Sequence, residues 1–366
     1  MRTAWRELVR RPGRFLVAGG ALTLIVILLL ILGGILDALI QGSTGVLRAQ
    51  SAPLIVYSSD ARGSLDRSRV SVQQARMIGS LSGVQEASGL GVALLGAAVP
   101  SETEPANVAL FGYRAPNLRV PAPPGPGRGY ADRSLEKDGV RVGQTLLLGS
   151  ARIPVDVVGW VEGTSYNLQG GLWVEPRTWR TALAANVPDA ALAPGGFEAI
   201  LVTPEPGVSP SSVASEIRRA VPDVTPLTID QAVAAIPGVT EQRSVFAAII
   251  GVTFAVAGLV VALFFALITI ERVGLLGMLK AIGASSRTLA AGLTLQAGLI
   301  AAGAFVAGGL ATMGLARVIP EAVPLVLQPG RAAFTAAGLA VTAILGSAVS
   351  FRRVIRIDPA SAVGGA

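Results

Sequence analysis

The 366-residue chain contains no cysteine and no histidine, and only 14% of its residues are charged. Without cysteine it has no disulfide, no thiol nucleophile and no thiolate metal site. Without histidine it lacks the usual general base and the commonest metal ligand. Soluble proteins carry about a quarter charged residues. The shortage of charge therefore argues against an ordinary soluble enzyme.

The missing charge corresponds to four runs that contain no Asp, Glu, Lys or Arg: Phe15–Leu36, Val245–Ile270, Thr288–Ala316 and Ala332–Phe351. About 20 apolar residues cross the hydrocarbon core of a bilayer, so each run suits one crossing. The first run is longer than the roughly 7–15 apolar residues of a signal peptide, and we expect it to be retained. The sequence predicts an α-helical membrane protein with four transmembrane helices.

Basic residues mark the ends of these runs. Five arginines precede the first run, Arg272, Lys280 and Arg287 lie between the second and third, and three arginines follow the fourth. The positive-inside rule then places both termini and residues 271–287 in the cytoplasm. We expect a multi-pass protein of the bacterial plasma membrane. The net charge is +7. We expect the basic residues to interact with membrane lipids and not with nucleic acid, because no nucleic-acid-binding motif occurs.

The same pattern divides the chain into four parts. Residues 1–40 are expected to form a cytosolic amphipathic helix and the first span, and residues 41–243 a large mixed α/β extracytoplasmic domain. Residues 244–351 hold the other three spans, and residues 352–366 a cytosolic tail. The proline-rich stretch 121–129 interrupts the α/β domain, which is therefore expected to have two lobes.

Short β-branched or aromatic runs predict strands within this domain at Pro53–Ser58, Asn107–Tyr113, Gln144–Leu148, Ile153–Val161 and Glu198–Val202. Helices are expected near Val72–Leu81, Pro176–Ala185 and Pro210–Ala220. Ser209 followed by Pro210 is typical of a helix start, and Thr228 with Gln231 of a capping box.

Residues Glu271–Ser285, ERVGLLGMLKAIGAS, form an amphipathic step between two apolar runs. Leu275, Leu279 and Ile282 share one helical face. Gly283 is expected to end this helix and Ser285 to cap the next one. A helix lying among the lipid headgroups explains the pattern as well as a helix that docks on a partner.

The stretch resembles the cytosolic loop of MacB/FtsX-like ABC transporter permeases, whose usual form is E-R-x-x-E-I-G-x-L-R-A-x-G-A-S. The matching residues are Glu271, Arg272, Gly277, Leu279, Lys280, Ala281, Gly283, Ala284 and Ser285. Leu275 stands where the family usually has glutamate.

Asp138–Trp179 is similar to the outer domain of MacB-like permeases, in which a β-hairpin follows a V-G-D-T-type turn. Arg2–Phe15 and Arg352–Val363 resemble the family's two ends.

The resemblance implies a four-span permease subunit of the type VII mechanotransmission kind. Such a subunit couples ATP hydrolysis by a separate cytosolic ATPase to conformational change of the extracytoplasmic domain, for export, extraction or mechanotransmission. Two alternatives stay open: an FtsX-like regulator of an extracytoplasmic partner such as a cell-wall hydrolase, without transport, and a membrane-anchored receptor without an ATPase. No P-loop occurs, so we expect a non-catalytic chain without cofactor or metal, with ATP and Mg²⁺ held by the ATPase.

The expected contacts with the ATPase are Glu271, Arg272, Leu275, Leu276, Leu279, Lys280 and Gly283. A homodimer is expected, because ABC ATPases work in pairs. Small residues on the third run should allow close helix packing, without indicating which helix they face: Gly298, Ala304, Gly308 and Ala311. An extracytoplasmic adaptor or substrate protein is a further expected partner.

Overall fold

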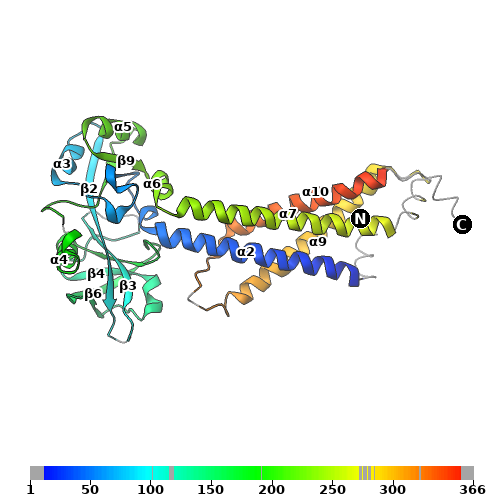
Figure 1. The fold of residues 1–366 in the computed structure, drawn as a ribbon, viewed down its shortest axis with the longest axis horizontal. Helices are drawn as coiled ribbons and strands as arrows, with labels where there is room; N and C mark the ends of the chain where they lie inside the picture. The colour runs from blue at the N-terminus through cyan, green and yellow to red at the C-terminus, as the bar shows by residue number, and fades with distance from the viewer. Residues whose placement is uncertain are drawn as a thin grey trace. The chain divides into compact units, whose positions relative to one another are not determined.

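The computed structural model describes residues 12–355 except 101, 115–118, 191, 272–273, 275–277, 279–281, 284 and 321–322. The chain divides into two compact units. The helical unit comprises the chain up to Ala38 together with the chain from Arg243 onward, and the sheet unit comprises Leu39–Gln242. Figure 1 shows the elements of both.

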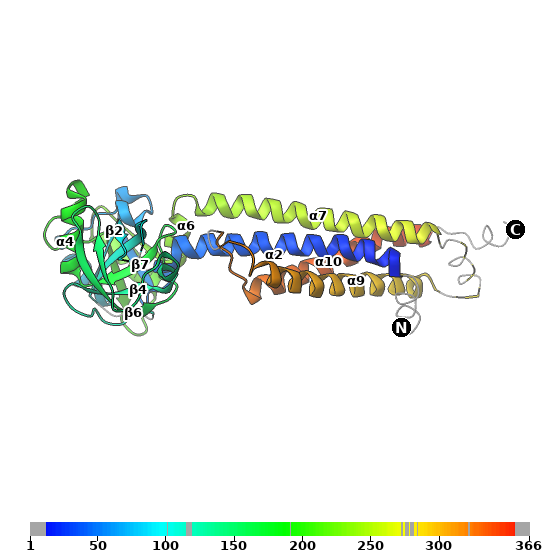
Figure 2. The same ribbon diagram turned by 90° about the horizontal axis from the view of Figure 1, so that it is seen from below.

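The helical unit is built from the long helices α2 (Pro12–Arg48, up to Ala38), α7 (Val239–Glu271, from Arg243), α9 (Ser286–Leu315) and α10 (Pro329–Ile355). Figures 1 and 2 show them running side by side. By length and composition, each contains a segment able to cross a membrane: Val17–Arg48, Val239–Glu271, Arg287–Leu315 and Pro329–Ser347. The prediction of four apolar helices is confirmed.

The core of the helical unit is narrow, and much of its apolar surface is exposed. Val26 of α2, Ala257 of α7, Ala304 of α9 and Leu339 of α10 contribute to one buried cluster. Large apolar side chains on the outward faces are more than half exposed, as Val252 is at 64%. Such a surface needs an apolar solvent or a partner to cover it, as in a protein embedded in a membrane.

The sheet unit contains nine strands in one mixed sheet within its described residues. They are β1 (Leu54–Ser58), β2 (Val84–Ala98), β3 (Ala106–Tyr113), β4 (Arg128–Asp132), β5 (Thr145–Leu148), β6 (Ile153–Val161), β7 (Gly170–Val174), β8 (Ala199–Pro204) and β9 (Val224–Thr228). The α-helices are α3 (Val72–Gly79), α4 (Pro176–Asn186), α5 (Pro210–Ala220) and α6 (Ile229–Ala235). Short 3₁₀ helices are η1 (Ser59–Ala61), η2 (Leu65–Arg67), η3 (Arg133–Asp138) and η4 (Pro188–Ala190).

The strands follow the order β3-β7-β4-β6-β5-β2-β8-β1-β9, and β3 also pairs with β2. The extra pairing closes β2, β3, β7, β4, β6 and β5 into a ring. The first part of β2 pairs with β8 and the second part with β3 and β5, so this long strand belongs both to the ring and to the extension β8-β1-β9. The extension uses the two ends of the unit's sequence and the ring its centre. The division into two lobes stays a prediction.

The predicted strands correspond to β1, β3, β5, β6 and β8, and the three predicted helices to α3, α4 and α5. The cap at Ser209 and the Thr228–Gln231 capping box are confirmed, as is the hairpin of β5 and β6. Strands β2, β4, β7 and β9 were not predicted. β2 is rich in alanine and glycine, β4 is short and polar, β7 begins with two glycines and β9 contains Pro226, so each lacks the usual β-branched pattern.

Candidate functional site

The segment 271–287, which was predicted to be cytosolic, is described only in part. Glu271 is the last residue of α7. Gly283 has φ +101°, a value that favours glycine, and Ser285 caps α9 by accepting a hydrogen bond from the backbone N–H of Thr288 (3.2 Å). Ile282 is 78% exposed. The other predicted contacts lie outside the described residues: Arg272, Leu275, Leu276, Leu279 and Lys280.

The four small residues predicted for helix packing lie in different surroundings on α9. Ala304 is buried, and a Cβ atom on Gly308 would lie 2.7 Å from Cγ1 of Val26 in α2. Ala311 is half-buried. Gly298 is exposed, and a Cβ there would meet no atom within 4 Å. Thus Gly308 gives α9 close access to α2, whereas Gly298 faces open space.

The C-terminal part of α2 within the helical unit carries a charged pair. Asp37 accepts two hydrogen bonds from Arg331 in the first turn of α10, one of them from Nε to Oδ2 at 3.0 Å. The two side chains are 12% and 24% exposed. A Cβ on Gly33 would lie 2.8 Å from Cδ of Arg331, so this glycine makes room for the arginine stem. The pair places the α9–α10 connection at the same end of the helical unit as the C-terminal part of α2.

The last turns of α2 are buried within the core of the sheet unit. Val46 and Leu47 are fully buried and pack in the same cluster as Tyr57 and Trp173. A Cβ on Gly45 would lie 2.8–3.0 Å from backbone atoms of the loop between β6 and β7. Residues 39–48 of α2 therefore belong to the core of the sheet unit, whereas residues 12–38 belong to the helical unit.

The loop between β6 and β7 holds this end of α2 through backbone hydrogen bonds. The N–H of Val46 donates to the carbonyl of Ser165 (3.0 Å), and the N–H of Leu168 donates to the carbonyl of Gly42 (3.0 Å). Asn167 and Leu168 have φ of +51° and +63° between the paired residues Tyr166 and Gln169. Consecutive positive φ values define a type I′ turn, which favours glycine at its second position. Leucine here is strained, and such strain often marks a functional contact.

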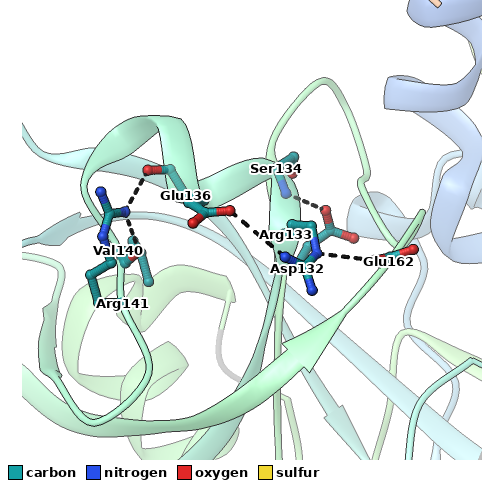
Figure 3. Close-up of polar contacts among 7 residues, drawn as sticks. All are labelled: Asp132, Arg133, Ser134, Glu136, Val140, Arg141 and Glu162. Carbon is teal, nitrogen blue, oxygen red and sulfur yellow. Dashed lines mark hydrogen bonds and ion pairs between the residues drawn. The ribbon is translucent and has the colours of Figure 1, made fainter.

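A polar cluster fixes the start of the same loop (Figure 3). Asp132, at the end of β4, is buried, and its carboxylate accepts hydrogen bonds from the N–H of Ser134 (2.9 Å) and from the N–H and hydroxyl of Thr164 (both 2.7 Å). Next to it, Nε of Arg133 lies 2.9 Å from a carboxylate oxygen of Glu162. Asp132 thus joins the ends of the parallel strands β4 and β6. No cluster of three or more potential metal-binding carboxylates occurs among the residues described.

Comparison with known proteins shows which proteins the chain resembles. Residues 247–359 match the FtsX-like permease C-terminal domain. An uncharacterized ABC transporter permease of Mycobacterium tuberculosis is 32% identical over 212 residues, which cover 54% of this chain and 59% of the relative. The chain is therefore similar to FtsX-like ABC transporter permeases in its C-terminal part. This similarity and the four apolar helices indicate a protein of the membrane.

Other known proteins match smaller parts of the chain or align with it at lower identity. A putative hemin transport system permease protein HrtB of Staphylococcus epidermidis is 25% identical over 112 residues, or 31% of this chain and 32% of that protein. The extracellular domain of YknZ from Gram-positive bacteria aligns with 48% of the chain at 14% identity and a TM-score of 0.34. The periplasmic region of MacB from Actinobacillus actinomycetemcomitans aligns with 52% at 13% identity and a TM-score of 0.36. The match spans about 59% of the length of the mycobacterial relatives.

Sequence reasoning did not single out the Asp37–Arg331 pair or the turn at Asn167 and Leu168. Asp37 follows the first apolar run and Arg331 precedes the fourth, and opposite charges at the ends of two apolar runs are a usable signal for such a pair. The turn at Asn167 and Leu168 has no such signal, because leucine is not typical of positive φ.

Proposed function

We propose that this chain is the motion-transmitting permease subunit of an ABC transporter. A separate cytosolic ATPase that binds ATP and Mg²⁺ would act on residues 271–287, and the helices would convey its motion to the sheet unit. In this proposal both termini are cytoplasmic and the sheet unit lies outside the bacterial plasma membrane, where it acts on a substrate or adaptor protein. Export and extraction are the two directions of transport that such a motion could drive.

The observation that carries the proposal is the burial of α2 in the core of the sheet unit. At 1.5 Å per residue, the 37 residues of α2 extend about 55 Å, well beyond the roughly 30 Å hydrocarbon core. Its last turns contribute Val46 and Leu47 to that core and bond to Ser165 and Leu168. A displacement along this helix would reach the loop after β6 through these hydrogen bonds.

The cytosolic end of the proposal depends on the apolar residues Leu275, Leu276 and Leu279. They would enter a groove on the ATPase, with Glu271, Arg272 and Lys280 at the rim and Gly283 ending the helix. A few apolar anchors usually carry most of the energy when a helix binds in a groove. The FtsX-like domain, which includes this segment, supports the assignment.

A second copy of the chain completes the proposed assembly, because the ATPase works as a pair. The exposed face of α7 supports this, since its apolar residues recur every seven positions in two rows: Val245, Val252 and Leu259, and Ile249, Val256, Leu263 and Ile270. A seven-residue repeat is the pattern of helices that pack along each other, and lipid contact does not require it.

The test of the coupling role is Leu279→Asp. A carboxylate buried without a partner should lower affinity for the ATPase by roughly 2 kcal/mol or more, or at least about 30-fold. We expect the ATPase to be lost from the complex purified from native membranes, as measured by quantitative mass spectrometry. ATPase activity stimulated by the permease should fall with it.

The matched control is Lys280→Gln on the adjacent position. An exposed ion pair contributes about 0–1 kcal/mol, so this variant should keep most of the ATPase. Both variants must insert into the membrane at the native level. An unchanged ATPase yield for inserted Leu279→Asp would support a helix lying in the headgroups and would contradict the coupling role.

A further inference from the structure

The sheet unit contains a groove of about 660 Å³ beside the end of β6. It is lined by Arg119, Arg133, Trp160, Val161, Glu162 and Gly163. Its volume lies within the range of about 300–1,000 Å³ that is usual for small-molecule sites. All of these residues belong to the sheet unit, so the groove is independent of the proposed coupling to an ATPase.

The walls of the groove are held from two sides. On one side, the buried carboxylate of Asp132 bonds to both Ser134 and Thr164, which flank the lining residues Arg133 and Gly163. On the other side, the loop continues to Ser165, whose carbonyl accepts from the N–H of Val46 in α2. A binding site gains affinity when its residues are held in place before the ligand arrives.

The charges of the groove favour an anion. It is lined by two guanidinium groups and one carboxylate, and Arg119 makes no ion pair with any residue that the structure describes. Arg133 contacts Glu162 (2.9 Å), but these side chains are 55% and 74% exposed. Such exposed pairs contribute only about 0–1 kcal/mol, so the carboxylate of a ligand can compete with Glu162 for Arg133. Arginine suits carboxylates because its planar fork can donate two hydrogen bonds.

Trp160 adds a flat apolar surface to these charges. Its ring is half-buried, and the guanidinium carbon of Arg133 lies 6.0 Å from the ring centroid. A bare inorganic anion would make no use of the indole, whereas a planar apolar body could stack on it. We propose that this groove binds a small organic anion, namely a carboxylate attached to a planar apolar group.

The test uses the full chain in lipid nanodiscs and 2-naphthoate as the probe, with binding measured by isothermal titration calorimetry and empty nanodiscs subtracted. We expect saturable binding to the native chain. The neutral analogue 2-naphthylmethanol and the small anion acetate should each bind at least tenfold more weakly, because each lacks one half of the recognised chemistry.

The decisive variant is Arg119→Gln. Arg119 is exposed and without an ion pair among the described residues, so the fold should be unaffected, and affinity for 2-naphthoate should fall at least tenfold. Arg128→Gln is the matched control, because it removes an exposed arginine at the opposite end of β4 and should leave affinity within twofold. Trp160→Leu should also weaken binding, provided that its thermal unfolding matches the native chain.

Three results would overturn the proposal. The first is the lack of saturable binding up to the solubility limit of 2-naphthoate. The second is equal binding to the native chain, Arg119→Gln and Arg128→Gln. The third is tighter binding of a hexaglutamate peptide than of 2-naphthoate in the same titration, because the occupant would then be an acidic protein segment.

Discussion

The two units of the chain bury a carboxylate in opposite ways. In the helical unit, Asp37 forms a two-pronged pair with Arg331. In the sheet unit, Glu198 is 1% exposed, yet it forms no ion pair with a described residue and accepts one hydrogen bond from the N–H of Val92 (3.0 Å). Burial raises the pKa of Glu198 to about 8. The first carboxylate is paired with an arginine, and the second is kept neutral by its surroundings.

The paired carboxylate and the unpaired one affect the stability of their units in different ways. A paired charge loses its stabilising effect when the partner is removed. A carboxyl group with a raised pKa loses stability when the pH rises, because the folded state must then hold an unpaired charge or bind a proton that the unfolded state releases. The two units should therefore respond to different perturbations.

The largest expected effect is a pH dependence of the sheet unit. Because the pKa of Glu198 rises from an ordinary 4.5 to about 8 on folding, its contribution is most favourable below pH 4.5 and is lost as pH rises to about 8. The free energy of unfolding should fall by roughly 3 to 5 kcal/mol across this window. Intrinsic fluorescence can follow it, since Trp160, Trp173 and Trp179 all lie in this unit.

Glu198→Gln keeps an acceptor for the N–H of Val92 and removes the ionisable group, so it should abolish most of this pH dependence. The control is Glu162→Gln, whose side chain is 74% exposed in the native chain and whose profile should follow the native one. An unchanged pH profile in Glu198→Gln would show that the carboxyl is ionised in the folded state and would remove the contrast with Asp37.

The next effect concerns the pair in the helical unit. Asp37→Ala leaves the 24% exposed side chain of Arg331 without its partner and should cost roughly 2 to 3 kcal/mol, since the pair is only partly buried. The chain contains no cysteine, so a single cysteine in place of Ala304, which is 3% exposed, can report unfolding of this unit. The temperature at which a thiol-reactive dye labels it should fall.

A double variant separates the pair from a general loss of packing. Replacing both groups, as in Asp37→Ala with Arg331→Met, removes the orphaned charge and should cost less than Asp37→Ala alone. If the cost of the double variant equals the sum of the costs of Asp37→Ala and Arg331→Met measured separately, then Asp37 and Arg331 do not stabilise each other. Tryptophan fluorescence should show an unchanged sheet unit in every case.

The elements of the helical unit could be predicted because they follow from a single property, the length of uncharged runs. The strands of the sheet unit were predicted less completely. β6 contains the β-branched pattern, whereas β2 reads as a series of small residues and is a strand because β3, β5 and β8 supply partners on both sides. Such tertiary pairing leaves no local signal in the sequence.

The site shows the same division. The cap at Ser285 and the glycine at position 283 follow from local rules and could be named in advance. The attachment of α2 to the loop after β6 could not, because it depends on Gly45 approaching a backbone about 120 residues away and on a leucine at positive φ. The groove likewise arises only where two parallel strands end together.

The packing around glycines also differs between the two units. Substitution of these glycines is expected to give the smallest effects on stability. In the sheet unit, Gly91 and Gly112 stand opposite each other on β2 and β3, and a Cβ on either would lie within 2.7 Å of Trp179. In the helical unit, many glycines meet nothing within 4 Å, as Gly298 does. The first kind is required by a neighbouring side chain, whereas the second leaves a surface that lipid or another helix can cover.

Gly91→Ala should therefore destabilise the sheet unit by roughly 1 to 3 kcal/mol, because Trp179 is fully buried and has no room to move away. Gly96→Ala on the same strand is the matched control. Its Cβ would have no neighbour closer than 3.7 Å, so this variant should change stability little.

Gly298→Ala should be neutral or stabilise α9 by about 0.5–1 kcal/mol through helix propensity. Tryptophan fluorescence during unfolding checks the first two and the cysteine reporter the third. Equal effects of Gly91→Ala and Gly96→Ala would contradict close packing against Trp179, and a destabilising Gly298→Ala would mean that another helix covers that face of α9.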